Sequence, residues 1–317
     1  MKRGRIGGAQ RLLLYGLVVA VLPAAAARAT SRYDIQLGMD YRRAQLDWNI
    51  AGDLSGSNPN VLSELRWYEL DIAQLNAALR AEAGRVVVDL AGDYGDVADG
   101  KNQDSDYLAD NRQLEFSRSA NQAGGRVYDA RLGVGYRFPL FDVALRHQGD
   151  IIPMLGWSLH RQNLYIRDGF AVVPAGGGPI NGLDSRYDAR WQGPWIGAML
   201  QLEAAARTVL SFDFAYHWAN YAAKADWNLR QDLAHPLSFR HDSVGSGVVA
   251  GLALSYRCSR HWSVVARVQA ESWKARPGVD TFYLVDADTG AVQAQATRLN
   301  AVRWTSRGLA LSALYRF

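Results

Sequence analysis

The sequence contains a single cysteine, Cys258, among 317 residues, which excludes an intramolecular disulfide and a cysteine-rich metal site. It also lacks an internal repeat, a phosphate-binding loop and a G-x-S-x-G nucleophile motif. The mean hydropathy is −0.17 and the only long apolar run lies at the extreme N-terminus, so the chain is not a helical membrane protein. Apolar residues make up 49% of the chain, with 10 Trp and 15 Tyr, which excludes an intrinsically disordered polypeptide.

Excess charge of one sign is confined to one end of the chain. The formal net charge is +4, from 35 Lys and Arg against 31 Asp and Glu. The first 29 residues contain no acidic residue and supply five of the cations: Lys2, Arg3, Arg5, Arg11 and Arg28. Without those five the balance is 30 against 31, a net charge of −1. The basic composition therefore belongs to the N-terminal segment, and no nucleic-acid partner is expected.

The N-terminal segment is organised as a secretory signal peptide. Residues 1–11 are cationic, Leu12–Ala26 is apolar, and Ala27–Ala29 has small residues at both recognition positions of an A-x-A cleavage site. This pattern predicts a signal peptide at 1–29 and one mature domain at 30–317. An N-terminal anchor helix is the alternative, although the apolar run is short for a membrane span. The sequence thus predicts export from the cytoplasm.

Apolar and polar residues alternate along the mature sequence. In 128–138 the even positions are Tyr, Ala, Leu, Val, Tyr and Phe, whereas the odd positions are Asp, Arg and Gly. Segments 248–256, 262–270 and 309–317 alternate similarly, and the last ends on Phe317, which resembles the C-terminal signature of bacterial outer-membrane barrels. One apolar face opposite a small or charged face is typical of strands in a membrane barrel. The alternative, a soluble β-sandwich, does not explain aromatic residues gathered at strand ends.

We therefore predict an all-β fold, a ten-stranded antiparallel transmembrane outer-membrane β-barrel. The strands are expected at 33–50, 61–82, 84–97, 124–140, 150–167, 184–206, 209–226, 238–258, 261–276 and 297–317. Long outside loops are expected near 51–60, 98–123, 168–183, 227–237 and 277–296, and short periplasmic turns near 83, 141–149, 207–208 and 259–260. Several strands exceed the roughly 9–11 residues that cross a bilayer. The barrel should project above the membrane, around a narrow lumen packed with polar side chains.

An acidic segment, 99–110, follows one predicted strand and contains Asp104 and Asp106. Two carboxylates one residue apart can point into one cleft and share a proton or a water, because close like charges raise one pKa. Two alternatives are a solvated polar loop and a calcium loop. The spacing lacks the Gly and terminal Glu of an EF-hand calcium loop.

The six histidines show no metal-ligand spacing with one another or with the cysteine, so neither a metal nor a cofactor is expected. His217 lies on the polar face of its strand and is expected in the lumen. His241 could pair with Asp242 or belong to a strand-end polar patch. Inward arginines are expected to pair with lumen carboxylates that include Asp129 and Glu271; these arginines are Arg131, Arg137, Arg257 and Arg267.

Five short segments follow one another in a recognisable order: Ser63–Trp67, Asp104–Tyr107, Phe116–Arg118, Pro194–Gly197 and Asp280–Asp286. They resemble the S-x-L-x-W, D-x-D-W, E-S-R, P-Y-I-G and final-loop Y-D-H segments of the omptin family. Omptins are ten-stranded outer-membrane barrels whose rim carries an aspartyl-type endoprotease site. The resemblance runs over nearly all the mature sequence.

In omptins a water is activated between an Asp pair and a facing His–Asp pair, without a covalent intermediate. The resemblance places the first pair on Asp104 and Asp106. A gapless match of the fourth outer loop puts Asn228 where the catalytic Asp stands and Arg230 where the His stands. An arginine accepts no proton near neutral pH and cannot serve as the base.

The same match puts Asp226 at an acidic specificity position. A shifted loop could bring His235 into the site in place of the missing base. The lipopolysaccharide-binding motif of omptins is not recoverable around 160–167.

Two functions follow. The residues favour an omptin-like barrel without protease activity, a surface binding or structural protein in which Arg230 neutralises Asp104 and Asp106. The alternative is an active surface endopeptidase that cleaves polypeptides near basic residues through an Asp-activated water. A passive pore is disfavoured because ten strands enclose little more than their own inward side chains. The expected location is the outer membrane of a Gram-negative bacterium, and the expected partners of the monomer are outer-membrane lipid, including lipopolysaccharide, and cationic peptides or proteins.

Overall fold

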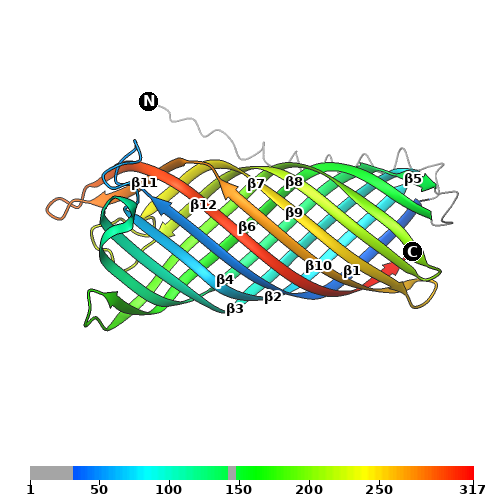
Figure 1. Ribbon diagram of the computed structural model, residues 1–317, viewed down its shortest axis with the longest axis horizontal. Coiled ribbons are helices and arrows are strands. Elements are labelled where there is room, and N and C mark those ends of the chain that lie inside the picture. The colour runs from blue at the N-terminus through cyan, green and yellow to red at the C-terminus, as the bar shows by residue number, and fades with distance from the viewer. Residues whose placement is uncertain (1–30, 142–147) are drawn as a thin grey trace, which may run out of the picture.

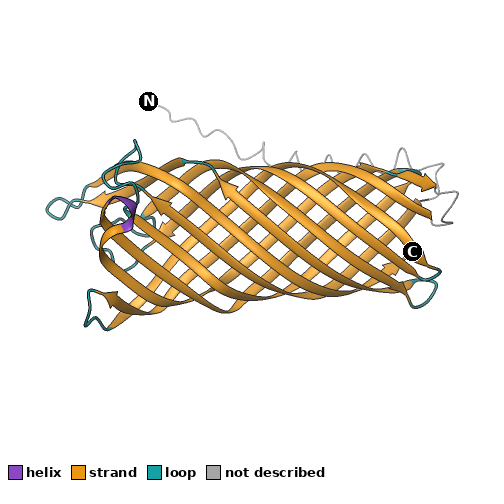
Figure 2. Cartoon of the chain, in the orientation of Figure 1, coloured by secondary structure: helices purple, strands orange, loops and turns teal. Residues whose placement is uncertain are grey.

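The structure is a computed structural model that describes residues 31–141 and 148–317. The predicted signal peptide and most of the predicted turn at 141–149 lie outside these residues. The described chain consists of antiparallel strands, short connections and a 3-10 turn at Asp110–Arg112 (Figure 2). In this part of the chain, no helix is long and apolar enough to cross a membrane.

Twelve strand segments follow one another along the described chain (Figure 1). They are β1 (Ser31–Ile50), β2 (Ser63–Ala83), β3 (Val86–Ala109), β4 (Gln113–Tyr136), β5 (Phe138–Phe141), β6 (Gln148–Val173), β7 (Pro179–Ala205), β8 (Thr208–Asp226), β9 (Phe239–Arg257), β10 (Trp262–Ala275), β11 (Gly278–Val285) and β12 (Val292–Arg316). Strand β5 continues β4 along β6, and β11 continues β10 between β9 and β12. Pairing of β1 with β12 closes the ring, so the described chain forms the expected ten-stranded barrel.

The strands are longer and the outer loops shorter than the sequence predicted. The expected loop at 98–123 is a hairpin, because β3 continues to Ala109 and β4 begins at Gln113. The expected loops at 168–183 and 277–296 are likewise mostly strand. Above a membrane the outer face of a strand meets water, so the apolar alternation that marks a membrane strand is lost there.

A lipid-facing belt surrounds the half of the barrel that contains the start of β1 and the C-terminus, at the right in Figure 1. We call this half the lower part of the barrel and the opposite half the upper part. On β1 the exposed apolar residues are Tyr33, Ile35, Leu37, Met39 and Tyr41, which fits the roughly 9–11 residues of a membrane strand. Strands β10 and β12 continue the belt with Val264, Val268, Leu309 and Leu311. Aromatic residues border it above at Tyr94, Tyr128, Tyr216 and Trp218, and below at Tyr136, Phe138, Trp262 and Phe317. These are the interfacial positions that Tyr and Trp prefer.

The apolar face switches sides where the strands leave this belt. After Tyr41, the buried inward residues of β1 are Ala44, Leu46, Trp48 and Ile50, whereas Arg43 points outward. Strand β10 changes in the same way, from outward Val268 to inward Trp273. The upper half of the barrel therefore has the polarity of a water-soluble protein, with apolar side chains inside.

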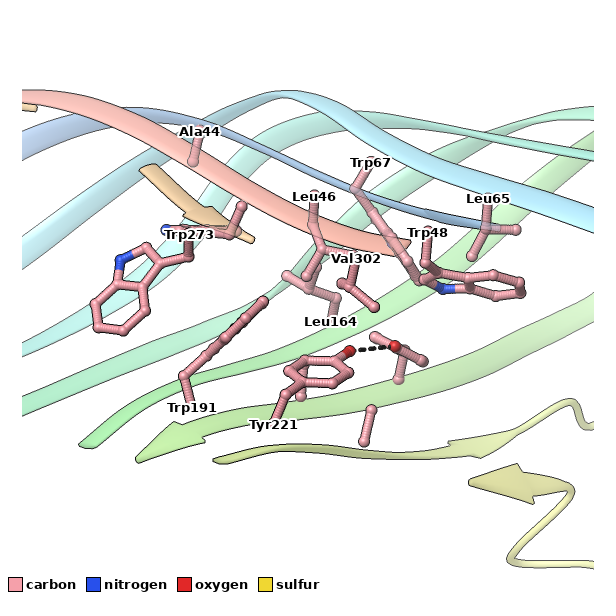
Figure 3. Close-up of a cluster of buried hydrophobic side chains, with 14 of the residues drawn as sticks. Ala44, Leu46, Trp48, Leu65, Trp67, Leu164, Trp191, Tyr221, Trp273 and Val302 are labelled. Carbon is pink, nitrogen blue, oxygen red and sulfur yellow. Dashed lines mark hydrogen bonds between the residues drawn. The ribbon is translucent and has the colours of Figure 1, made fainter. Parts of the chain in front are cut away.

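These inward side chains form what we call the upper core (Figure 3). Its largest fully buried members are Trp67, Trp191, Trp273, Trp304, Tyr187 and Tyr221. The expectation of a polar lumen throughout is therefore wrong for the upper half. The reason is the hydrophobic effect: once the outer surface is wet, burying apolar side chains inside the ring becomes favourable.

The lower lumen is polar, as expected, but its ion pairs differ from those predicted. Asp129 and Glu271 both contact Arg42, at 2.8 and 3.2 Å, instead of the four predicted arginines. Of those, Arg131 pairs with Asp89, Arg137 with Glu82 and Asp150, and Arg267 with Asp213, while Arg257 donates to the Ala206 carbonyl. Arginine side chains reach across the lumen, so neighbours along the sequence do not identify their partners.

Candidate functional site

Asp104 and Asp106 lie on β3 well above the lipid-facing belt, near the outer end of the barrel. They are half-buried and occupy one face of the strand, because alternate strand residues point the same way. Asp104 stands opposite Leu65 of β2, and Asp106 stands opposite Ser63 of β2 and Ser117 of β4. The strand period therefore brings the two carboxyl groups together, as the sequence predicted, although they lie in a strand and not in a loop.

Both carboxyl groups hold their protons more tightly than an ordinary aspartate. Burial and the charge of Asp106 raise the pKa of Asp104 to about 8, against the opposing effects of the Trp227 indole and the Arg230 charge. Burial also raises the pKa of Asp106, opposed by the hydroxyl of Ser63 and the charge of Arg230. Two such groups titrate as a unit, so at neutral pH the pair retains about one proton and one negative charge.

Arg230 approaches this pair from the loop between β8 and β9. Its charge lowers the pKa of both aspartates, but its hydrogen bonds go to Asp232, with Nε–Oδ1 at 2.8 Å and Nη2–Oδ2 at 2.6 Å. A turn fixes its backbone, since the amide of Arg230 donates to the carbonyl of Trp227 at 2.9 Å. We call Asp104, Asp106, Ser63, Ser117, Trp227 and Arg230 the rim site.

The side chain of Asn228 contacts the start of β7. Its Oδ1 accepts from the amide of Asp184 at 2.9 Å and from the hydroxyl of Ser185 at 3.3 Å, and its Nδ2 donates to the carbonyl of Gly182 at 2.7 Å. These three bonds use the amide group to hold the β8–β9 loop against β7. Asn228 thus lies beside the rim site as a structural link between the β8–β9 loop and strand β7.

Asp226 and His235 form a pair of their own. Asp226 ends β8 on its outward face, and its Oδ1 lies 2.6 Å from Nδ1 of His235. Both side chains are partly exposed. The principal charges and hydrogen bonds that act on Asp104 and Asp106 in the described residues do not include either side chain.

A row of fully buried polar side chains lies below the rim site, and the sequence did not predict it. The Tyr187 hydroxyl lies 2.5 Å from that of Tyr221 and 2.9 Å from Nδ1 of His241, whose Nε2 lies 3.3 Å from Asp280. Of the two possibilities for His241, the pair with Asp242 does not form, because Asp242 points to the other face and pairs with Arg240. The members come from four strands, so no local motif could have revealed the row. In residues 31–141 and 148–317, no three His, Cys, Asp or Glu side chains gather closely enough to hold a metal ion.

A model of the Protochlamydia outer membrane protein (Pom) family matches residues 36–317. The chain belongs to this family. No curated protein matches the chain. With the barrel architecture, membership of Pom places the protein in the outer membrane of a Gram-negative bacterium.

Among solved structures, an outer-membrane protease is similar in fold to this Pom-family chain. The crystal structure of the outer membrane protease OmpT from Escherichia coli has a TM-score of 0.72 at 14% identity, covering 90% of this chain and 96% of that one. OprG from Pseudomonas aeruginosa gives a TM-score of 0.36 at 9% identity, covering 91% and 97%. Neisserial surface protein A gives 0.29 at 12%, covering 90% and 97%. At this level of identity the OmpT likeness shows a common barrel fold.

Proposed function

We propose that this Pom-family barrel is a monomeric surface protein whose rim site binds cationic polypeptide segments without cleaving them, with outer-membrane lipid, including lipopolysaccharide, around its belt. One observation carries the proposal: the groups that act most strongly on Asp104 and Asp106 are hydroxyl, indole, carboxylate and guanidinium groups. None of the nitrogen groups among them accepts a proton near neutral pH. The side of the rim site that faces the Asp pair, where omptins have a His–Asp pair, therefore has no base.

Binding of a cation fits the same contacts. The Asp pair keeps one negative charge in a half-buried cleft, where a charge–charge interaction is stronger than in water. Arg230 already places a guanidinium near this charge while Asp232 holds it. A Lys or Arg of a ligand would therefore compete with Arg230 for the pair.

An omptin-type endopeptidase is the second candidate, and the raised pKa of Asp104 favours it. A carboxyl pair that holds one proton near neutral pH is the arrangement that aspartic proteases use to activate water. In this version Asp226 would select a basic side chain, and His235 would supply a base after movement of its loop.

Fluorogenic peptides with paired basic residues test the two functions on purified, refolded protein. We expect no cleavage, and binding that weakens as salt is added, because the contact is between charges. Arg230→Ala should strengthen binding by roughly tenfold, the effect of about 1.4 kcal/mol, and Asp104→Ala should weaken it by a similar factor at pH 9, where the parent's Asp104 has lost its proton. Affinity should rise from pH 6 to pH 9 as Asp104, with its pKa of about 8, loses its proton, and Asp104→Ala should flatten that rise.

Asp96→Ala is the matched control, since Asp96 is an exposed carboxylate of the same strand that pairs with Arg126 outside the rim site. Its variant should bind like the parent. Cleavage by the parent that disappears in Asp104→Ala would establish the endopeptidase. Affinity unchanged by both rim variants would remove the rim site from the account.

A further inference from the structure

Below the upper core, the polar lumen contains two cavities that share part of their walls. The larger, about 360 Å³, lies at the periplasmic end, where Ala206 and Arg207 of the β7–β8 turn line it. The smaller, about 180 Å³, lies deeper, and we call it the chamber. Both are lined by Gln36, Arg80, Met199, Asp213 and Arg267. The two cavities therefore adjoin one another along these five side chains.

Two buried histidines face the chamber from β6 and β8. His160 and His217 line it with 8% and 1% of their surfaces exposed. Nδ1 of His160 lies 2.9 Å from the carboxylate of Asp129, and Nδ1 of His217 lies 2.8 Å from the hydroxyl of Ser158. The Nε2 atom of each ring is buried and has no hydrogen-bond partner among the described residues.

The contact with the Asp129 carboxylate sets which nitrogen of the His160 ring is free. Asp129 also accepts from Arg42 and is an acceptor only, so Nδ1 of His160 donates to it and Nε2 keeps a lone pair. The Ser158 hydroxyl can accept from Nδ1 of His217 in the same way. A carboxylate or hydroxyl on one nitrogen, with the other nitrogen bare, is the arrangement that orients histidines bound to metals.

The spacing of the rings suits one shared ion. Their centroids lie 5.7 Å apart and their planes meet at 85°. With metal–nitrogen bonds of about 2.0–2.1 Å, two imidazoles on a single ion have centroids about 5–6 Å apart. Trp273 packs against both rings, at 4.3 and 4.8 Å, which restricts their rotation.

The charge of the chamber favours a cation. Six carboxylates and three arginines line it: Asp40, Asp89, Asp93, Asp129, Asp213 and Glu271, with Arg80, Arg131 and Arg267. Arg42 pairs with Asp129 and Glu271, and the three lining arginines pair with Asp89 or Asp213. No ion pair within the described chain involves Asp40 or Asp93, so six carboxylates face four arginines. One oxygen of Asp40 is buried without a hydrogen-bond partner. A divalent ion would offset the uncompensated negative charge.

We propose that the chamber binds a borderline divalent cation such as Zn²⁺ through Nε2 of His160 and Nε2 of His217. Imidazole ligands favour zinc, copper or nickel over calcium or magnesium. The described residues place no third protein ligand beside these two, so water completes the coordination. The site is independent of the rim site and of its proposed function.

Titration of the refolded chain with Zn²⁺, followed by calorimetry, tests this site. We expect one Zn²⁺ per chain, with binding lost in His160→Ala and His217→Ala. Ser158→Ala should weaken binding by about 10-fold, the usual effect of removing a partner that orients a ligand. The matched controls, His235→Ala and His261→Ala, remove partly or fully exposed histidines outside the chamber and should leave affinity unchanged.

Copper supplies a measurement that needs no variant. Electron paramagnetic resonance of the parent chain with one equivalent of Cu²⁺ should show two nitrogen ligands. A spectrum with oxygen ligands only would overturn the proposal. Equal affinity for Zn²⁺ and Ca²⁺, or Zn²⁺ affinity unchanged in a folded His160→Ala/His217→Ala chain, would also overturn it.

Discussion

Trp191→Ala is expected to lower the free energy of unfolding by about 3–5 kcal/mol, the usual cost of deleting a large aromatic side chain from a packed core. Trp191 is fully buried in the upper core, 4.4 Å from the Tyr221 ring and 5.9 Å from the Trp273 ring. Its indole also donates to Gln162 at 3.1 Å, and the variant leaves this buried amide without its partner. Urea unfolding in lipid vesicles, followed by circular dichroism, measures the change.

Trp157→Ala is the matched control for this substitution. Trp157 is 52% exposed on the lipid-facing belt, so acyl chains can fill the space that the indole leaves. Its loss should cost much less than the loss of Trp191. Equal costs at the two positions would show that the upper half of the barrel does not depend on a packed interior.

Leu37→Arg is expected to cost about 2–4 kcal/mol, because a cation on the lipid face near the bilayer midplane loses its hydration. Leu37 lies in the middle of the apolar residues of β1 and is 60% exposed to the surroundings of the barrel. The measurement is the same urea unfolding in vesicles.

Gln45→Arg provides the comparison on the same strand and the same face. Position 45 lies above the belt, where the outer surface meets water, so the added charge should change stability by less than about 0.5 kcal/mol. If Gln45→Arg were as damaging as Leu37→Arg, the membrane would extend further up the barrel than the switch of polarity indicates.

Period-two alternation was sufficient to predict the membrane part of the fold. The residues 262–270 and 309–317 were assigned to strands with one apolar face, and β10 and β12 pair over these residues. The hairpin around residues 110–112 was missed because polar residues occupy both faces of a strand that stands in water. Composition alone cannot distinguish such a strand from a loop.

The upper core is also visible in the sequence, as a change in which alternate positions are apolar. On β1 the apolar positions are odd up to Tyr41 and even from Ala44 onward. A reversal of phase within an unbroken strand marks the height at which the surroundings change from lipid to water. The same reversal predicts buried tryptophans such as Trp48 inside the upper barrel.

The rim site was only partly accessible from sequence. Asp104 and Asp106 could be placed together because a strand repeats every two residues. The roles of Asn228 and Asp226 depend on the path of the β8–β9 loop, which no periodicity fixes. His160 and His217 lie on strands separated by β7, so their approach required the closed ring.

A spin-label scan along β1 tests most directly the claim that both faces of the barrel change polarity at one height. Single cysteines from 35 to 50, in a Cys258→Ser background that removes the exposed natural thiol, would carry the label in lipid vesicles. We predict access of oxygen from the lipid at odd positions up to 41, access of a water-soluble nickel chelate at odd positions from 43, and access of neither at 46 and 48. Oxygen access that continues at odd positions to 49, or chelate access at 46 and 48, would contradict it.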